Sequence, residues 1–180
     1  MWRQVWDSKG KDAILCHNFP YDIYSIKGSC GPQSQTCLQF NFAVQPGSYS
    51  EYSGRTIPVT KSNIQDRSET ILDQWGKTGS LFPHNVVLVP LGDDFTYTND
   101  AEWDQQYSNY NQILEYINNN NYNAQVQWGT LSDYFAAVNS RIARFDNLVG
   151  DFFVYSDVFS EGMFCQLFMY ISSAVCLYFW

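Results

Sequence analysis

The sequence predicts an α/β fold, and specifically an incomplete part of a mostly parallel β/α barrel-like domain. This prediction rests on the order of the elements after residue 60, where apolar runs typical of strands alternate with amphipathic stretches typical of helices. Strand–helix–strand order implies right-handed crossovers and a parallel sheet. About three strands can be identified, fewer than the eight that close such a barrel. The fold is therefore expected to belong to something larger.

The first third of the chain is expected to be mostly irregular. Glycine and proline recur throughout residues 11–60, and the segment Cys37–Phe42 is the one short strand that the pattern favours there. Loops of this length are usually functional or belong to a larger fold. Thr60 and Ser62 then suit the start of a helix that ends near Gly79.

Two strands and two helices follow. Residues 86–91 form a continuous, mostly β-branched apolar run, which is typical of a strand buried on both faces. Large apolar side chains recur at four- and three-residue spacing over 103–117 and predict a helix with one apolar face. Residues 124–128 alternate like a strand. Thr130 and Asp133 then suit a capping box that opens a third helix.

The last expected strand covers residues 151–155. After Gly162 the chain becomes an apolar tail, residues 163–180, which is long enough to be a marginal transmembrane candidate. No Lys or Arg flanks this tail to orient it in a membrane, and polar residues interrupt it. We therefore expect a truncation or splicing product rather than an anchor, and membrane contact only through this tail.

Composition restricts the partners. A chain of 180 residues is long enough for one domain. Its net charge of −8 repels phosphate backbones, so nucleic acid is not an expected partner. Aromatic residues make up 18% of the chain, and these either fill the core or line a sugar site. The first residues lack the apolar stretch of a signal peptide, so any targeting signal is expected outside this chain.

Adjacent carboxylates follow the most clearly buried strand. Reactive groups of parallel α/β folds lie just past the carboxyl ends of strands, and Asp93 and Asp94 occupy such a position; Asp157 follows the last expected strand. Neighbouring carboxylates repel, which favours one of them keeping its proton and acting as a general acid. The alternative is that both cap a turn or face solvent.

The histidines and cysteines give weaker signals. His17 and His84 lack metal-ligand spacing, and a structural role is favoured for both. Cys30 and Cys37 bracket a turn-prone stretch, which suits either a small disulfide loop or two reduced thiols.

Six segments together resemble glycoside hydrolase family 38 α-mannosidases of the Golgi mannosidase II type. They occur in the same order as in that family, over roughly residues 1–162, which we define as a partial N-terminal catalytic domain. The segments are WRQ from Trp2, ILCH from Ile14, CGP from Cys30, NVVLVPLGDDF from Asn85, QWGTLSDYF from Gln127 and GDFFVYSD from Gly150.

The resemblance assigns roles to individual residues. It implies that Asp94 is the general acid/base, that Asp93 supports it, and that Tyr24 contacts the sugar. It also implies a disulfide between Cys30 and Cys37. Ser25 stands where the family has an aspartate, so the hydrogen bond made from that position is not expected here.

The resemblance further implies a retaining, zinc-dependent enzyme that removes terminal α-linked mannose from a mannose-containing glycan. Its expected compartment is the Golgi lumen of the secretory pathway, with the lysosome as the alternative. The zinc ligands and the nucleophilic aspartate of the family fall outside the matching segments, so no metal ligand is expected in this chain. The chain alone is thus expected to be inactive, and the alternative functions are an inert isoform or a weak carbohydrate-binding fragment.

Overall fold

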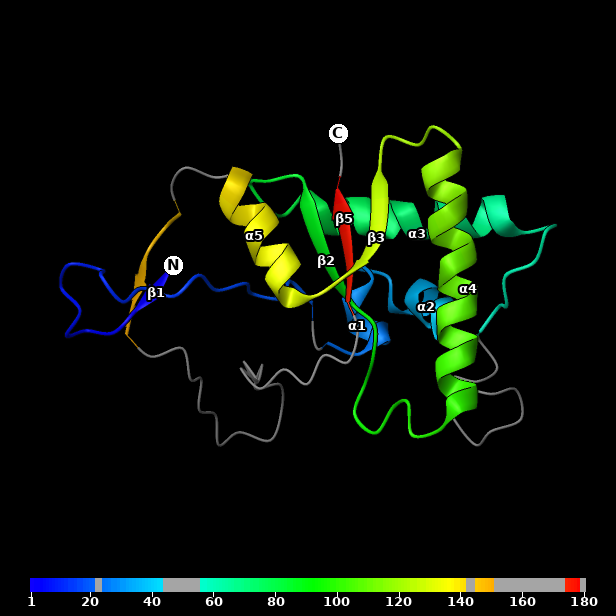
Figure 1. The fold of residues 1–180 in the computed structure, drawn as a ribbon, viewed down its shortest axis with the longest axis horizontal. Coiled ribbons are helices and arrows are strands. Elements are labelled where there is room, and N and C mark those ends of the chain that lie inside the picture. Colours follow the sequence, from blue (N-terminus) through cyan, green and yellow to red (C-terminus); the bar gives the residue numbers. More distant parts are fainter. Residues whose placement is uncertain (22–23, 44–55, 142–144, 151–173, 179–180) are drawn as a thin grey trace.

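The computed structural model describes residues 1–21, 24–43, 56–141, 145–150 and 174–178 (Figure 1). In chain order the elements are β1 (Trp2–Arg3), α1 (Ile26–Ser29), α2 (Ser34–Cys37), the 3-10 helix η1 (Leu38–Phe40), α3 (Ile64–Gly79), β2 (Val86–Pro90), α4 (Asp100–Asn119), β3 (Gln125–Gly129), α5 (Leu131–Arg141), β4 (Leu148–Val149) and β5 (Ala174–Tyr178).

A three-stranded sheet, in the order β2-β5-β3, forms the centre of the fold. β2 and β3 both pair antiparallel with β5, so they run in the same direction as each other. The strands expected at 86–91 and 124–128 are confirmed. The strand expected at 151–155 lies outside the described residues, and membership of a larger barrel-like domain stays a prediction.

Helices cover both faces of this sheet, with α5 on one face and α3 on the other (Figure 1). Side chains of α3 and α4 form the larger core cluster with Val87, Val89 and Val126, whereas Val86 and Leu88 pack with α5. All five residues of β2 are buried. Alternate side chains of β2 therefore pack into two different core clusters. This explains why its sequence is apolar throughout instead of alternating.

The expected helices are confirmed, and local hydrogen bonds explain two of their starts. Asn99 accepts the backbone N–H of Glu102 at 3.1 Å and caps α4. At α5, Thr130 Oγ1 accepts the N–H of Asp133 at 3.2 Å, and the Asp133 carboxylate accepts the N–H of Thr130 at 2.8 Å. This is the predicted capping box, and the bonds from Thr130 lower the pKa of Asp133.

The strand predicted at Cys37–Phe42 is wrong, because this segment is helical in α2 and η1. Leu38, Phe40 and Phe42 are buried, and so is Cys37. Short helical turns place these side chains in the core without a strand, so the segment is apolar although its backbone is not extended.

A disulfide joins Cys30, at the end of α1, to Cys37, at the end of α2. Gly31 follows Cys30 and passes very close to α3: a Cβ at this position would lie 2.7 Å from both Cβ and Oε1 of Gln74. The same Oε1 accepts the backbone N–H of Gln33 at 3.1 Å. Glycine is required here so that the disulfide loop can rest against α3.

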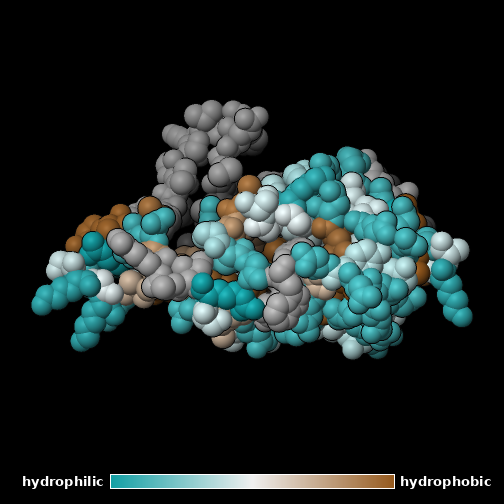
Figure 2. All heavy atoms as spheres, turned by 90° about the horizontal axis from the view of Figure 1, so that it is seen from above, coloured by the Kyte–Doolittle hydropathy of each residue, from teal (hydrophilic) through white to brown (hydrophobic). Residues whose placement is uncertain are grey.

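The amino-terminal residues form a small outlying ribbon. β1 pairs in parallel with β4, and Trp2 Nε1 donates to the carbonyl of Gly150 at 2.6 Å. Figure 2 shows apolar atoms at this end of the molecule. The exposed apolar side chains here are Val5, Trp6, Ile14, Leu148 and Val149. Among the helices that the structure describes, none combines the length and apolar character of a membrane span.

A partly buried histidine, His17, lies between α5 and the entry to β2. His17 Nδ1 and the hydroxyl of Tyr134 are 2.8 Å apart, and the His17 ring stacks on Phe82, which in turn stacks on His84. Burial, and secondarily the charge of His84, lowers the pKa of His17 to about 4. His84 Nδ1 accepts the N–H of Val86 at 3.3 Å, which confirms the structural role predicted for His84 at the strand entry.

The fold is expected to become less stable as the pH is lowered from 7.5 to 5, because of His17. The unfolded chain takes up a proton near the ordinary pKa of 6.5, whereas the folded chain resists protonation down to about 4. The contribution of His17 to the free energy of unfolding is therefore fully present well above pH 6.5. The free energy of unfolding should drop by about 2 kcal/mol between pH 7.5 and pH 5. Urea denaturation at these two pH values measures the drop. His17→Asn should remove most of the dependence, and an unchanged dependence in that variant would contradict this account.

Candidate active site

The candidate site lies where β2 ends. After Pro90 the chain passes through the buried Leu91 and the partly buried Gly92 to the exposed Asp93 and Asp94. Two contacts with α1 fix this strand end: Ser29 Oγ donates to the Pro90 carbonyl at 2.6 Å, and the Ile26 N–H donates to the Gly92 carbonyl at 3.2 Å. The carboxylates therefore follow the end of a buried strand, as the sequence predicts, and α1 holds this end in place.

Tyr24 lies directly against this carboxylate pair. Its hydroxyl donates a hydrogen bond to the carboxylate of Asp94, across 70 residues of sequence. The N–H of Asp94 in turn donates to Asp93 Oδ1 at 2.8 Å. The structure thus brings together the three residues to which the resemblance assigned roles, from the start of α1 and the end of β2.

The two carboxylates differ in their surroundings. Partial desolvation raises the pKa of Asp93, and the charge of Asp94 acts in the same direction; the Asp94 N–H and the Lys27 ammonium oppose the rise. A raised pKa favours the protonated form of Asp93, which reduces the negative charge beside Asp94. Both side chains are exposed, and Asp94 differs in accepting a hydrogen bond from the Tyr24 hydroxyl.

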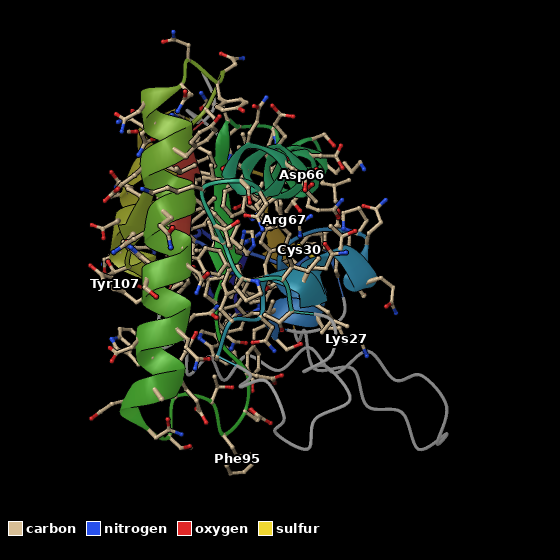
Figure 3. All side chains as sticks on the ribbon, turned by 90° about the vertical axis from the view of Figure 1, so that its right-hand side faces the viewer. Lys27, Cys30, Asp66, Arg67, Phe95 and Tyr107 are labelled. Carbon is tan, nitrogen blue, oxygen red and sulfur yellow. A yellow bond between two sulfur atoms is a disulfide. The ribbon has the colours of Figure 1, made fainter. Side chains whose placement is uncertain are left out.

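The loop after the carboxylates is held in an unusual conformation. Phe95 and Tyr97 have φ values of 55° and 63°, a region that such side chains rarely adopt. The Tyr97 hydroxyl donates to the Leu91 carbonyl at 3.2 Å and ties the loop back to the strand. Phe95 is 95% exposed and points away from the body of the protein at the tip of this loop (Figure 3). An exposed aromatic ring beside the carboxylates is suited to the apolar face of a sugar.

Sequence reasoning did not find Lys27, Phe95 or Tyr97. The charge of Lys27 lowers the pKa of Asp93, but in the sequence Lys27 is a single lysine in a segment without a regular pattern. The hydrogen bond of Tyr97 depends on a reversal of the backbone, which a pattern of apolar residues does not predict. One available signal was position, because both aromatic residues follow the GDD segment within four residues.

The ionisation of Tyr24 tests this geometry in the chain alone. The hydrogen bond to Asp94, then desolvation and the two carboxylate charges, raise the pKa of Tyr24 above its ordinary value of 10.0. Asp94→Asn should lower this pKa toward 10.0, because a negative phenolate would then lie beside a neutral amide. A pH titration by carbon NMR of labelled tyrosine measures it, with Tyr24→Phe assigning the signal and Asp100→Asn as the charge-matched control. An unchanged Tyr24 pKa in Asp94→Asn would show that the contact is absent.

The residues that the structure describes do not fit a zinc ion. Within them, no three His, Cys, Asp or Glu side chains gather into a group that could hold a metal. Nδ1 of His17 and of His84 already takes part in a protein hydrogen bond. Asp157, the other carboxylate singled out in the sequence, lies outside the described residues.

Comparisons with known proteins agree on one family. Residues 1–158 match the family described as "Glycosyl hydrolases family 38 N-terminal domain". "Alpha-mannosidase 2" of Spodoptera frugiperda is 48% identical over 163 residues, which cover 89% of this chain and 14% of that protein. The proteins of the same name from Drosophila melanogaster and Homo sapiens are 41% and 40% identical, each over 87% of this chain and 15% of the relative. The chain thus spans about one seventh of the length of these relatives.

Proposed function

The chain belongs to glycosyl hydrolase family 38, and from this premise we propose that it carries the acid/base half of an α-mannosidase active site within a longer protein. The observation that carries the proposal is the contact of Tyr24 with Asp94 beside Asp93, at the carboxyl end of a buried strand. Asp94 is the member that accepts the Tyr24 hydroxyl, and it is proposed to be the one that reaches a bound sugar. The relatives named above are α-mannosidases, which supports mannose as the sugar.

In this proposal Asp94 acts first as a general acid and then as a general base. As a carboxylic acid it gives its proton to the glycosidic oxygen while the bond from that oxygen to the anomeric carbon breaks. As a carboxylate it then takes a proton from the water that attacks the anomeric carbon. Tyr24 positions the carboxylate through its hydrogen bond. Asp93, with its raised pKa, limits the negative charge beside it.

A retaining mechanism needs a second carboxyl group about 5 Å from the acid, on the other side of the anomeric carbon. Asp93 cannot take that place, because it is the sequence neighbour of Asp94 and its Oδ1 accepts the Asp94 N–H. We propose that the longer protein supplies the nucleophile and the zinc ligands, and that residues 1–180 alone do not turn over substrate. The substrate is proposed to be terminal α-linked mannose of N-glycans.

The proposed compartment is the secretory pathway, in the Golgi lumen, with the lysosome as the alternative. The Cys30–Cys37 disulfide supports an oxidising compartment. The resemblance of this sequence to the Golgi mannosidase II type, and the relatives named "Alpha-mannosidase 2", support the same pathway.

Hydrolysis of aryl glycosides by the longer protein tests the function. We expect turnover of 4-nitrophenyl α-mannoside, with the α-glucoside and the β-mannoside slower by at least about 100-fold. A chelator should abolish turnover and Zn²⁺ should restore it. Equal rates on the mannoside and the glucoside would overturn the substrate, and full activity after metal removal would overturn the zinc dependence.

A further inference from the structure

The central sheet contains a slot between two strands that run the same way. β2 and β3 are joined through α4, a crossover typical of parallel neighbours, yet they do not pair with each other. β5 lies between them in the opposite direction. Its residues align in rows with both neighbours: Tyr178 with Val86 and Gln125, Cys176 with Leu88 and Gln127, and Ala174 with Pro90 and Gly129.

The outer edge of β3 is closed by a side chain. Asn118 of α4 donates Nδ2 to the Val126 carbonyl at 2.8 Å and accepts the Val126 N–H at 2.9 Å. The N–H and C=O of one strand residue point to the same side, so Val126 faces away from β5, and Gln125 and Gln127 face toward it. Asn118 thus occupies a backbone pairing site that another strand would use, which protects this edge against strand addition. The inner edge is the one that needs a strand.

β2, on the other side of the slot, also needs a neighbouring strand. It is buried along its whole length and contributes to both core clusters. Backbone N–H and C=O groups that are buried without partners destabilise the fold, so the strand needs a hydrogen-bonding neighbour. Antiparallel strands of mostly parallel sheets lie at the edge as a rule. A strand in the middle that opposes both neighbours is the unusual feature of this sheet.

We propose that residues 174–178 are a plug strand, which closes the slot between β2 and β3 from within the same chain and excludes a parallel strand from it. Residues 174–178 are then a structural part of the central sheet. Because the slot is full, the sheet cannot be continued there by a strand from a longer form of the fold or from a second copy. The inference does not depend on the proposed function, since it concerns only the backbone pairing of the sheet.

Engineered disulfides in the full chain test both the place and the direction of the plug strand. In a background with Cys16, Cys165 and Cys176 changed to serine, Gln125→Cys is combined with Tyr178→Cys or, as the matched control, with Ala174→Cys. Hydrogen-bonded antiparallel partners have Cα atoms about 5.5 Å apart, within the range that a disulfide spans. Ala174 lies four residues further along the strand, which places it about 13 Å away. Gln125 and Gln127 are exposed, so neither change at β3 should disturb the core.

After mild oxidation, peptide mapping should find an intrachain disulfide in the Tyr178 variant and none in the Ala174 variant. Gln127→Cys with native Cys176 should also cross-link, in a background that lacks Cys16 and Cys165 only. Cross-linking in the Ala174 variant alone would show a parallel strand and overturn the proposal. So would the absence of any disulfide, or disulfides that form only between two copies.

Discussion

Asp94→Asn in the longer protein should reduce the hydrolysis of mannosides with poor leaving groups by about 10²–10⁴-fold. The asparagine side chain cannot give a proton to the glycosidic oxygen, and it cannot later accept one from water. A 2,4-dinitrophenyl mannoside needs little protonation to leave, so its first step should be nearly unaffected. Its second step should slow, and the glycosyl-enzyme should accumulate as a burst. Steady-state rates and burst amplitudes on the two substrates measure this pattern.

Asp100→Asn is the matched control for this change. Asp100 is exposed in the first turn of α4 and loses the same charge without touching Tyr24 or Asp93. It should leave both rates within about twofold, because surface substitutions of this kind rarely cost more than 0.5 kcal/mol. An equal loss on both substrates in Asp94→Asn would assign the residue to sugar binding and contradict its acid/base role.

Trp75→Ala should destabilise the fold by about 3–5 kcal/mol. Trp75 has no exposed surface and lies on α3 in the larger core cluster, together with the residues of α4 and the side chains of β2 that face them. Its removal leaves a cavity between the helices and the sheet. For a domain of this size such a loss is a large share of the total stability. Urea denaturation followed by circular dichroism measures it.

Trp6→Ala controls for the loss of a tryptophan as such. Trp6 is 77% exposed, and its removal should change the free energy of unfolding by no more than about 0.5 kcal/mol. If both variants lost similar stability, or if Trp75→Ala lost less than about 1 kcal/mol, the packing described for α3 would be wrong.

Periodicity predicted most helices and strands, because the apolar pattern of each segment reflects which of its side chains are buried. The apolar run at 86–91 identified a strand that is buried throughout, and the Thr130–Asp133 pair identified the start of α5. The helix pattern at 103–117 was correct in type, but Trp103 and Tyr107 remain 42% and 44% exposed. Figure 1 shows the reason, since the first half of α4 extends beyond the end of the sheet. A helical pattern shows which side chains share a face, not whether anything covers that face.

The role of the tail could not be predicted, because strand pairing across more than 40 residues leaves no local signal. Residues 174–178 are apolar, which fits a membrane segment, an aggregating tail or a buried strand equally well. In the structure residues 174–178 pair with β2 and β3, and the sequence carries no signal for this pairing.

The candidate site divides in the same way. Asp93 and Asp94 follow from their place after a buried strand, whereas their partners come from distant parts of the chain. The contact between Tyr24 and Asp94 spans 70 residues, and only the family resemblance anticipated a role for Tyr24. Lys27 and Tyr97 act through charge and a loop reversal, which the sequence pattern does not encode.

The central claim is that this chain holds the acid/base half of a glycosidase site and lacks the rest. Hydrolysis of an aryl α-mannoside by residues 1–180, with added Zn²⁺ and beside Asp94→Asn, tests that claim most directly. The account predicts no turnover above background by either protein. Turnover by the native chain that is lost in Asp94→Asn would place a nucleophile and a metal site within these 180 residues, and would contradict it.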